Sequence, residues 1–247
     1  MDFYDLFYDL NIKGNHFQSD LAIIKEAIRL NWNHLTLRYS PEKFKDLNYK
    51  KELIENIENM EEIAIPKDFS IGFGLEINVK KSNDIRNNIN KFKKDADLFS
   101  VLGGNPKINR MACESLQVDI LSRPYFRRYD SGINQVLAKE ALKNNVAIEL
   151  CIKDILTTYL SHRAKVIANF RDIIKLYRKF KFPLIISSGA SSIFDIRHPR
   201  DIIAIFKEIG LKEEEIQDCF NSYPRNIIDF NKERENIIVV GAKVIKK

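Results

Sequence analysis

The sequence predicts an α/β fold built on a parallel barrel, and three observations lead to this prediction. Seven short, nearly all-apolar runs recur along the chain, as expected for strands that are buried on both faces. Longer amphipathic stretches lie between them. No linker rich in Pro, Gly or Ser divides the 247 residues, of which 45% are hydrophobic. About seven βα units in one uninterrupted chain favour a TIM-type barrel, complete or irregular, as a single domain over residues 1–247.

The individual elements follow from local patterns in the sequence. The predicted strands occupy residues 3–10, 34–39, 70–79, 98–102, 118–121, 147–151 and 184–187. Helices are clearest at 19–30, 133–143 and 166–180, where apolar residues recur on one face. Pro41 and Pro199 stand at first helical positions. Ser82 is expected to cap a helix that has Asp84 in its first turn, and Gly210 to close the helix that Pro199 opens.

A doubly wound open sheet is the rival architecture for the same pattern. In its nucleotide-binding form it needs a glycine-rich phosphate loop after the first strand. The corresponding segment, residues 11–15, contains a single glycine, Gly14. The barrel is therefore the favoured fold.

Composition narrows the cellular setting. The chain has 40 Lys and Arg against 34 Asp and Glu, and the net charge of +6 favours an anionic partner without identifying it. The cysteines Cys113, Cys151 and Cys219 are scattered, with no C-x-x-C motif, which predicts reduced thiols. Acids stand where a signal peptide needs a basic region, and no apolar run approaches 18 residues. We expect a cytoplasmic protein without membrane contact.

In a barrel the functional groups sit at the C-terminal ends of the strands. Those positions are rich in Arg, Lys, Ser and Asn and hold no histidine. The four histidines form neither H-x-H nor H-E-x-x-H, so we expect no metal site. The run from Ser187 to Ala190 does not match G-x-S-x-G and predicts a tight turn. A histidine and an acid that are distant in the sequence but close to these serines in space remain an alternative. Cys151 ends an apolar run, and a single cysteine there is predicted to be a core residue. We therefore expect no catalytic residue.

Basic clusters are the stronger signal. Residues 163–181 carry seven Lys and Arg against one Asp, a balance of +6. Residues 80–94 form a second cluster, and residues 123–129 interleave Arg with aromatic side chains. Arg binds phosphates bidentately and aromatic rings stack on unpaired bases. For each cluster taken alone, the alternative is a charged surface that is simply solvated. The acidic residues at 52–62 and 213–215, however, lie apart from the basic clusters in the sequence. This separation favours a polyanion as the partner but does not distinguish RNA from DNA.

Three segments carry a family resemblance over nearly the whole chain. The first is Tyr8-Asp9-Leu10-Asn11. The second, within residues 117–150, includes Ser122-Arg123-Pro124 and Arg127-Arg128-Tyr129-Asp130-Ser131-Gly132. The third, within 182–201, includes Ser187-Ser188-Gly189-Ala190 and Ile196-Arg197-His198-Pro199-Arg200. Their order and spacing resemble the archaeal ribonuclease P protein component 3 family.

The resemblance implies a seven-stranded, TIM-like barrel related to the polymerase-and-histidinol-phosphatase (PHP) hydrolases. Where those hydrolases have the metal motif D-x-H-x-H, this chain has Asp9-Leu10-Asn11-Ile12-Lys13. Arg38-Tyr39-Ser40 stands at the Asp-His position, and Ser188-Gly189-Ala190-Ser191 at the S-D-A-H position. Glu76 resembles a retained metal-site glutamate. We expect a barrel that has lost hydrolysis and whose mouth suits phosphate.

By this resemblance the chain is a protein subunit of ribonuclease P, the ribonucleoprotein endonuclease that removes the 5′ leader of precursor tRNA. The RNA subunit cuts with Mg²⁺, and the isolated chain is non-catalytic and binds no cofactor. The implied partners are the ribonuclease P RNA, a small RRM-like protein component 2 in a two-plus-two assembly, other ribonuclease P proteins and, indirectly, precursor tRNA. The predicted RNA contacts are Arg38, Arg123, Arg127, Arg128, Lys153, Arg163, Arg171, Arg178, Arg197 and Arg200.

Two other functions stay open at this point. One is a PHP-like phosphoesterase with a rearranged metal site, which stoichiometric metal in purified protein would support. The other is a protein-interaction scaffold without nucleic-acid contact, which salt-insensitive binding would support.

Overall fold

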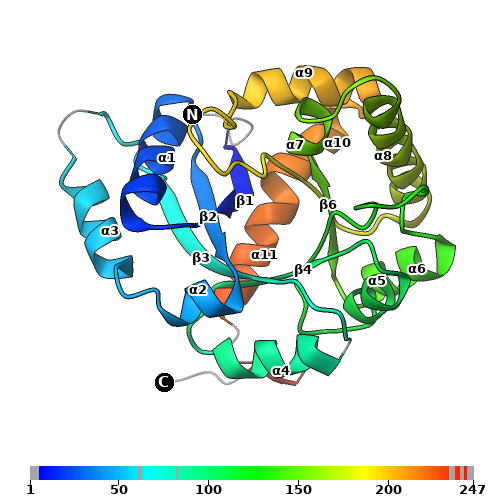
Figure 1. Cartoon of the computed structure of the whole chain (residues 1–247), viewed down its shortest axis with the longest axis horizontal. Helices are drawn as coiled ribbons and strands as arrows, with labels where there is room; N and C mark the ends of the chain where they lie inside the picture. Colours follow the sequence, from blue (N-terminus) through cyan, green and yellow to red (C-terminus); the bar gives the residue numbers. More distant parts are fainter. Residues whose placement is uncertain (1–5, 61–62, 82, 234–236, 240–241, 244–247) are drawn as a thin grey trace.

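Seven parallel strands form the centre of the protein, and helices surround them (Figure 1). The structure is a computed structural model that describes residues 6–60, 63–81, 83–233, 237–239 and 242–243. The strands pair in sequence order, which confirms the predicted barrel class. They are β1 (Tyr8–Lys13), β2 (His34–Tyr39), β3 (Ser70–Ile77), β4 (Leu98–Leu102), β5 (Ile120–Ser122), β6 (Ala147–Cys151) and β7 (Leu184–Ser187).

The two outer strands of this sheet, β1 and β7, approach each other and nearly close the barrel. The backbone N–H of Lys13 donates to the carbonyl of Ala190 at 2.8 Å. The buried carboxylate of Asp9 accepts from the backbone N–H of Ser188 at 3.2 and 3.3 Å. These contacts bring the end of β1 against the turn that follows β7.

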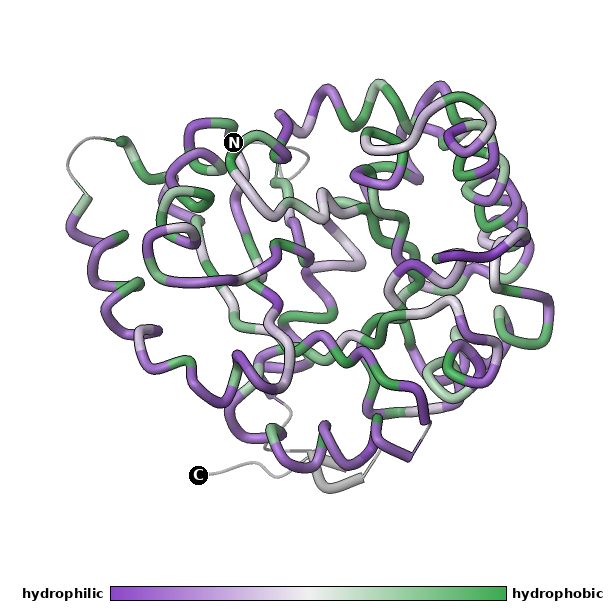
Figure 2. Tube along the Cα trace, viewed as in Figure 1, coloured by the Kyte–Doolittle hydropathy of each residue, from purple (hydrophilic) through white to green (hydrophobic). Residues whose placement is uncertain are grey.

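Helices follow most strands and bury one face on the barrel, while hydrophilic residues cover the outside (Figure 2). They are α1 (Phe17–Arg29), α2 (Pro41–Lys45), α3 (Lys50–Glu58), α4 (Asn83–Phe92), α5 (Pro106–Cys113), α6 (Gln135–Lys143), α7 (Lys153–Leu156), α8 (Leu160–Phe180), α9 (Pro199–Ile209), α10 (Glu213–Gln217), a π-helical turn (Asp218–Ser222) and α11 (Tyr223–Lys232). A hairpin of β8 (Ile237–Val239) and β9 (Ala242–Lys243) lies outside the barrel sheet.

The predicted helix punctuation is confirmed where the structure describes it. The Ser40 hydroxyl accepts from the backbone N–H of Lys43 at 3.4 Å, directly before Pro41. His198 caps α9 in the same way, and Gly210 ends that helix with a φ of 122° that glycine tolerates. The expected cap at Ser82 lies outside the described residues.

The first strand differs most from the prediction. It runs from residue 8 to 13, three residues beyond the predicted end, while residues 3–5 of the predicted strand lie outside the described part. Asn11 is fully buried and hydrogen-bonds inside the barrel. This polar side chain interrupts the apolar run from which the end of the strand was predicted. Similarly, β5 ends at Ser122, whose hydroxyl also faces inward. The long helix α8 begins at Leu160, six residues before its predicted start.

One end of the barrel is closed by apolar side chains. Ile227 of α11 packs on Leu98, Ile120 and Ala147, which start β4, β5 and β6. Burial of such side chains contributes roughly 1.5–3 kcal/mol each. Helix α11 therefore plugs the N-terminal end and leaves polar side chains to the C-terminal end, here called the barrel mouth.

Candidate functional site

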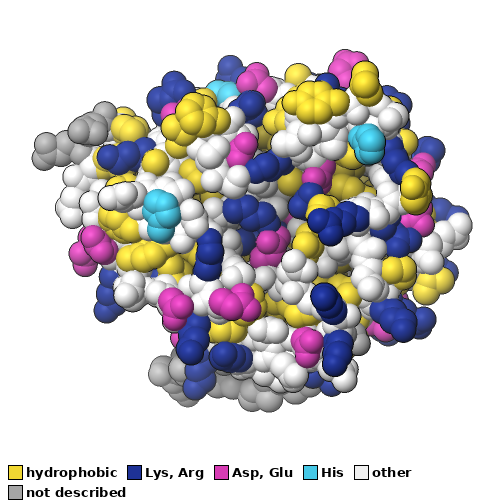
Figure 3. Space-filling view, viewed as in Figure 1, with side chains coloured by type: hydrophobic (Ala, Val, Ile, Leu, Met, Phe, Trp, Pro, Cys, Tyr) yellow, Lys and Arg dark blue, Asp and Glu magenta, His cyan; other side chains and the backbone are white. Residues whose placement is uncertain are grey.

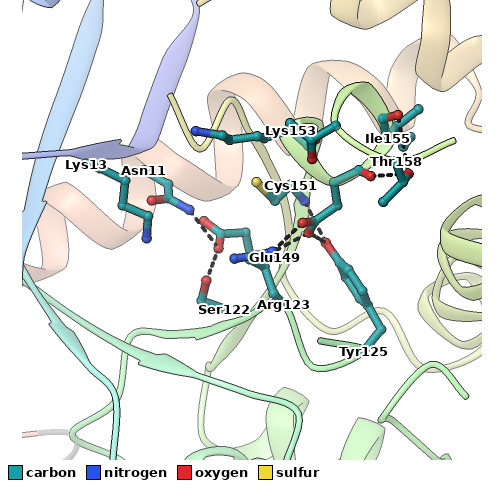
Figure 4. A network of polar contacts seen from close by, with 12 residues as sticks. Asn11, Lys13, Ser122, Arg123, Tyr125, Glu149, Cys151, Lys153, Ile155 and Thr158 are labelled. Atoms are coloured by element: carbon teal, nitrogen blue, oxygen red, sulfur yellow. Dashed lines mark hydrogen bonds and ion pairs between the residues drawn. The ribbon is translucent and has the colours of Figure 1, made fainter. Parts of the chain in front are cut away.

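A buried ion pair lies inside the barrel mouth. Nη2 of Arg38 on β2 lies 2.8 Å from Oε1 of Glu149 on β6, and neither side chain is exposed. The two groups meet as an ion pair rather than as an aligned hydrogen bond. The other carboxylate oxygen of Glu149 accepts from Asn11 Nδ2 at 3.2 Å and from the Ser122 hydroxyl (Figure 4). Side chains from three strands, β1, β2 and β5, thus converge on the carboxylate of a fourth, β6.

This convergence keeps Glu149 ionised. Burial alone raises the pKa of a carboxyl group, but the Arg38 guanidinium, the Ser122 hydroxyl and the Lys13 ammonium together hold the pKa of Glu149 below its ordinary value. Asp9 shows the opposite balance, because its burial outweighs its hydrogen bonds and raises its pKa.

Three further ion pairs lie at the same end of the barrel as the buried one. Lys13 contacts Glu76, and Arg123 contacts Asp154 bidentately. Lys153 lies 2.9 Å from Asp195 in the segment after β7. Each of these four cations inside the mouth therefore has its own carboxylate, and the four pairs together carry no net charge. The interior of the mouth is therefore neutral instead of cationic, and phosphate binding by its outer loops stays a prediction.

The remaining space at the mouth is a small cleft. Its volume is about 160 Å³, and its lining includes Asn11, Lys13, Arg123, Cys151 and Lys153. Burial raises the pKa of the Cys151 thiol to about 12, so this sulfur stays protonated and is a poor nucleophile. Cys113 and Cys219 are buried free thiols as well.

The histidine on the described strands of the barrel sheet lies away from the mouth. His34 begins β2 at the opposite end, where its ring nitrogens contact Ser70 at 2.8 Å and Thr36 at 3.0 Å. Among the described residues no cluster of three or more His, Cys, Asp or Glu could hold a metal ion. Glu76, which resembles a retained metal-site glutamate, is paired with Lys13 instead.

The Asp130-Ser131-Gly132 segment is a structural turn. The Asp130 carboxylate accepts from the backbone N–H of Gly132 at 3.0 Å, and the Ser131 hydroxyl donates to the carbonyl of Ile133 at 3.0 Å. The side-chain amide of Asn109 on α5 holds this turn by donating to the carbonyls of Gly132 and Pro124, both at 2.9 Å. These bonds hold the loop after β5.

The ten predicted RNA contacts fall into three groups. Arg38 alone forms the first group, because its side chain is buried against Glu149 and cannot reach a phosphate at the surface. Arg127 and Arg200 are exposed and have no carboxylate partner in the described part of the chain. The other seven are already bonded within the protein: Arg123, Arg128, Lys153 and Arg178 to carboxylates, and Arg163, Arg171 and Arg197 to backbone carbonyls.

The basic face of α8 is partly neutralised by an acidic segment that is distant in sequence. Arg178 bonds bidentately to Glu215 on α10, at 2.8 and 2.6 Å. Lys175 pairs with Asp172 on its own helix. The acids at 213–215 are therefore separate from this cluster in the sequence but not in space.

The cluster around α4 is different. Its six basic side chains are exposed, and within the described residues none of them forms an ion pair: Lys80, Lys81, Arg86, Lys91, Lys93 and Lys94. We call these six residues the α4 surface. The sequence showed the cluster, but only the fold shows that its cations form no ion pair among the described residues; Lys91 acts on the Glu42 carboxylate only at longer range.

Fold and site define the class of protein: an α/β barrel whose mouth is closed by ion pairs and whose outside carries a free basic surface. A family model described as RNase P subunit p30 matches residues 6–236. The chain is 41% identical over 239 residues to Ribonuclease P protein component 3 of Methanothermobacter thermautotrophicus, covering 97% of this chain and 95% of the relative. For the Methanocaldococcus jannaschii protein of the same name the identity is 32%, with 93% and 94% covered. The chain belongs to the RNase P subunit p30 family.

Solved structures agree with this assignment. A chain in a cryo-EM structure of archaeal ribonuclease P with mature tRNA matches with a TM-score of 0.75 at 28% identity, covering 97% of this chain and 98% of that one. An ochratoxinase from A. niger matches with a TM-score of 0.55 at 8% identity, over 91% and 71% of the two chains. The second likeness concerns the fold alone. The family supports a ribonuclease P subunit, part of a tRNA-processing enzyme, and not the phosphoesterase alternative.

Proposed function

We propose that this chain supports ribonuclease P by binding its RNA subunit through basic surfaces and takes no chemical step itself. The observation that carries the proposal is the α4 surface, whose six cations have no carboxylate partner among the described residues. Unpaired surface cations release condensed counterions when they meet phosphates, and this release drives binding to nucleic acids. Paired cations contribute less because their charge is already compensated.

The barrel mouth supports the non-catalytic part of the proposal. A hydrolase needs an activated water or nucleophile and groups that stabilise developing charge. Here Lys13 and Glu76 neutralise each other, and Glu149 is held by Arg38. The RNA subunit then cuts the 5′ leader of precursor tRNA with its own Mg²⁺, and the protein lowers the Mg²⁺ requirement by neutralising close-packed phosphates.

The partner set is also a proposal. We propose that the chain assembles with a small RRM-like protein component 2 in a two-plus-two arrangement, with other ribonuclease P proteins, and with precursor tRNA only indirectly. A cytoplasmic location fits this role. In the described part of the chain no helix has the length and apolar character needed to cross a membrane.

The test measures binding of the full chain to ribonuclease P RNA as a function of salt. Lys91→Gln, Lys93→Gln and Lys94→Gln are combined in one variant. If these lysines contact three phosphates, the slope of log affinity against log salt falls by about 2–3. The matched control combines Lys139→Gln, Lys143→Gln and Lys207→Gln on α6 and α9, where two of the three lysines already have carboxylate partners.

The outcomes separate the candidate functions. An unchanged slope in the α4 variant, with affinity equal to that of the control, would contradict the proposal. Reconstituted ribonuclease P adds a second readout: the α4 variant is expected to need more Mg²⁺ for the same cleavage rate. Stoichiometric metal in the purified chain, with phosphoesterase activity that chelation abolishes, would instead establish a hydrolase.

A further inference from the structure

Three successive loops at the barrel mouth expose large apolar side chains. They follow β5, β6 and β7 and therefore lie at the same end of neighbouring strands. Tyr129 is 93% exposed, Leu160 91%, Phe194 80% and Tyr159 70%. We call these four residues and Phe126 the β5–β7 rim. So many exposed apolar side chains on adjacent loops mark a surface that binds something.

Contacts between the loops make the rim one continuous surface. Lys165 on α8 places its ammonium 3.4 Å from the ring centroid of Tyr129, which joins the loop after β5 to the start of α8. Arg123 joins the same loop to Asp154 on α7. Lys153 joins the end of β6 to Asp195 in the loop after β7. Figure 3 shows hydrophobic and basic side chains interleaved on the side of this face where α8 lies.

Each ring in the first two loops of the rim has a cation against it. Arg163 lies 5.4 Å from the ring centroid of Tyr159, and Arg123 and Arg127 lie 4.4 and 5.1 Å from that of Phe126. These distances are typical of cation–π contacts, which occupy one face of a ring. With 93% of Tyr129 exposed, its second face is open to a ligand.

The charge of the rim is positive. The carboxylates of the loops that carry it, Asp130, Asp154 and Asp195, are all paired with cations of these loops. Arg127, Arg163 and Lys165 have no carboxylate partner in the described structure. The rim thus offers open ring faces and, beside them, uncompensated positive charges.

We propose that the β5–β7 rim binds unpaired nucleotides of an RNA, with bases stacked on Tyr129 and Tyr159 and phosphates at Arg127, Arg163 and Lys165. Proteins that bind single strands combine aromatic platforms with a positive track in this manner. A protein partner fits less well, because the centres of protein interfaces are depleted of lysine, whereas Lys165 lies directly over the most exposed ring. The inference rests on the proposed RNA-binding function and adds base contacts to phosphate contacts.

The experiment uses the full chain and two RNA probes. One is a single-stranded oligoribonucleotide of about 12 nucleotides that contains 2-aminopurine, within the usual site sizes of single-strand binders. The other is the duplex of the same sequence. Wild-type protein is expected to quench the fluorescence of the single strand, because stacking quenches 2-aminopurine, and to bind the duplex without this signal.

Two substitutions test the platforms. Tyr129→Ala and Tyr159→Ala are each expected to weaken single-strand binding about fivefold to tenfold and to reduce quenching, within the range known for base–aromatic stacking. Neither removes a charge, so the salt slope stays the same. Tyr129→Phe keeps the ring and retains binding. Phe230→Ala removes an exposed ring from α11, at the other end of the barrel, and is the matched control without effect.

The outcomes keep this inference apart from the proposed function. Normal quenching and affinity in both alanine variants, together with salt-dependent binding to ribonuclease P RNA, would overturn the rim proposal alone. Loss of the small protein subunit from the reconstituted complex in these variants, with RNA binding intact, would assign the rim to a protein partner. Absence of any salt-dependent RNA binding by the wild type would overturn both.

Discussion

Arg38 on β2 and Glu149 on β6 lie across the barrel from each other and form an ion pair at 2.8 Å with neither side chain exposed. A buried pair of this kind adds little net stability, but removing one partner leaves an uncompensated charge. Glu149→Gln is therefore expected to lower the free energy of unfolding by about 3–5 kcal/mol. Urea denaturation measures the change.

The double variant Arg38→Met with Glu149→Leu isolates the cause. It removes both charges together and is expected to recover more than half of the lost stability, although Asn11 and Ser122 lose their acceptor. Glu26→Gln, which breaks an exposed pair with Arg29 on α1, is the control and changes nothing measurable. If Glu149→Gln unfolds at the same urea concentration as the wild type, the charge is not buried as described.

This pair also shows how far the sequence alone can lead. Strand positions and helix punctuation follow from local patterns, which is why six of the seven strands lie within two residues of their predicted bounds. Glu149 stands within an apolar run and gives no local sign of its partner, which is distant in the sequence. Ion pairing at the mouth depends on which strands face each other across the barrel, and no local pattern reports that. The neutralisation of α8 by Glu215 was missed for the same reason.

His34 makes stability depend on pH. Burial, with a smaller effect of Lys232, lowers the pKa of this histidine from 6.5 to about 3. The folded state therefore holds a neutral ring while the unfolded chain takes up a proton below pH 6.5. Unfolding is therefore coupled to proton uptake below pH 6.5. This group lowers the free energy of unfolding by up to about 1.4 kcal/mol for each unit by which the pH falls.

Between pH 6.5 and 4.5 this histidine is expected to dominate the slope of the free energy of unfolding. His34→Gln can still hydrogen-bond Ser70 or Thr36 but carries no titrating proton, so its slope in this window is flatter. His162→Gln, at an exposed position on α8, serves as the control. Equal slopes for wild type and His34→Gln would show that His34 is not the group responsible.

Gly132 is required by the turn after β5. Its φ is 72°, and a Cβ there would lie 2.0 Å from the carbonyl oxygen of Pro124, a backbone atom that cannot move aside cheaply. Gly132→Ala is expected to destabilise the fold by more than the roughly 1–3 kcal/mol of a strained backbone alone. Thermal unfolding of Gly210→Ala gives the comparison, because Gly210 also has a positive φ but no atom within 4 Å of its Cβ position. Equal losses in the two variants would mean that the close approach to Pro124 has no effect.

Arg178 and Lys94 allow a one-for-one comparison of paired and free cations. Arg178 is bonded bidentately to Glu215, whereas Lys94 belongs to the α4 surface and has no carboxylate partner among the described residues. Each substitution to Gln removes one positive charge, so a response to net charge alone is the same in both. If local free charge matters, Lys94→Gln lowers the salt slope of RNA binding by about 0.7–0.9 and Arg178→Gln leaves it nearly unchanged.

A third variant, Glu215→Gln, tests whether Arg178 can contact RNA once its carboxylate partner is removed. It frees the Arg178 guanidinium without altering any basic residue, so an RNA that passes over α8 is bound more tightly and with a steeper salt slope than by the wild type. Equal effects of Lys94→Gln and Arg178→Gln would contradict the division into free and neutralised surfaces. A drop in slope for Arg178→Gln alone would place the RNA over α8 rather than α4, because only direct contact with phosphate can outweigh the bond to Glu215.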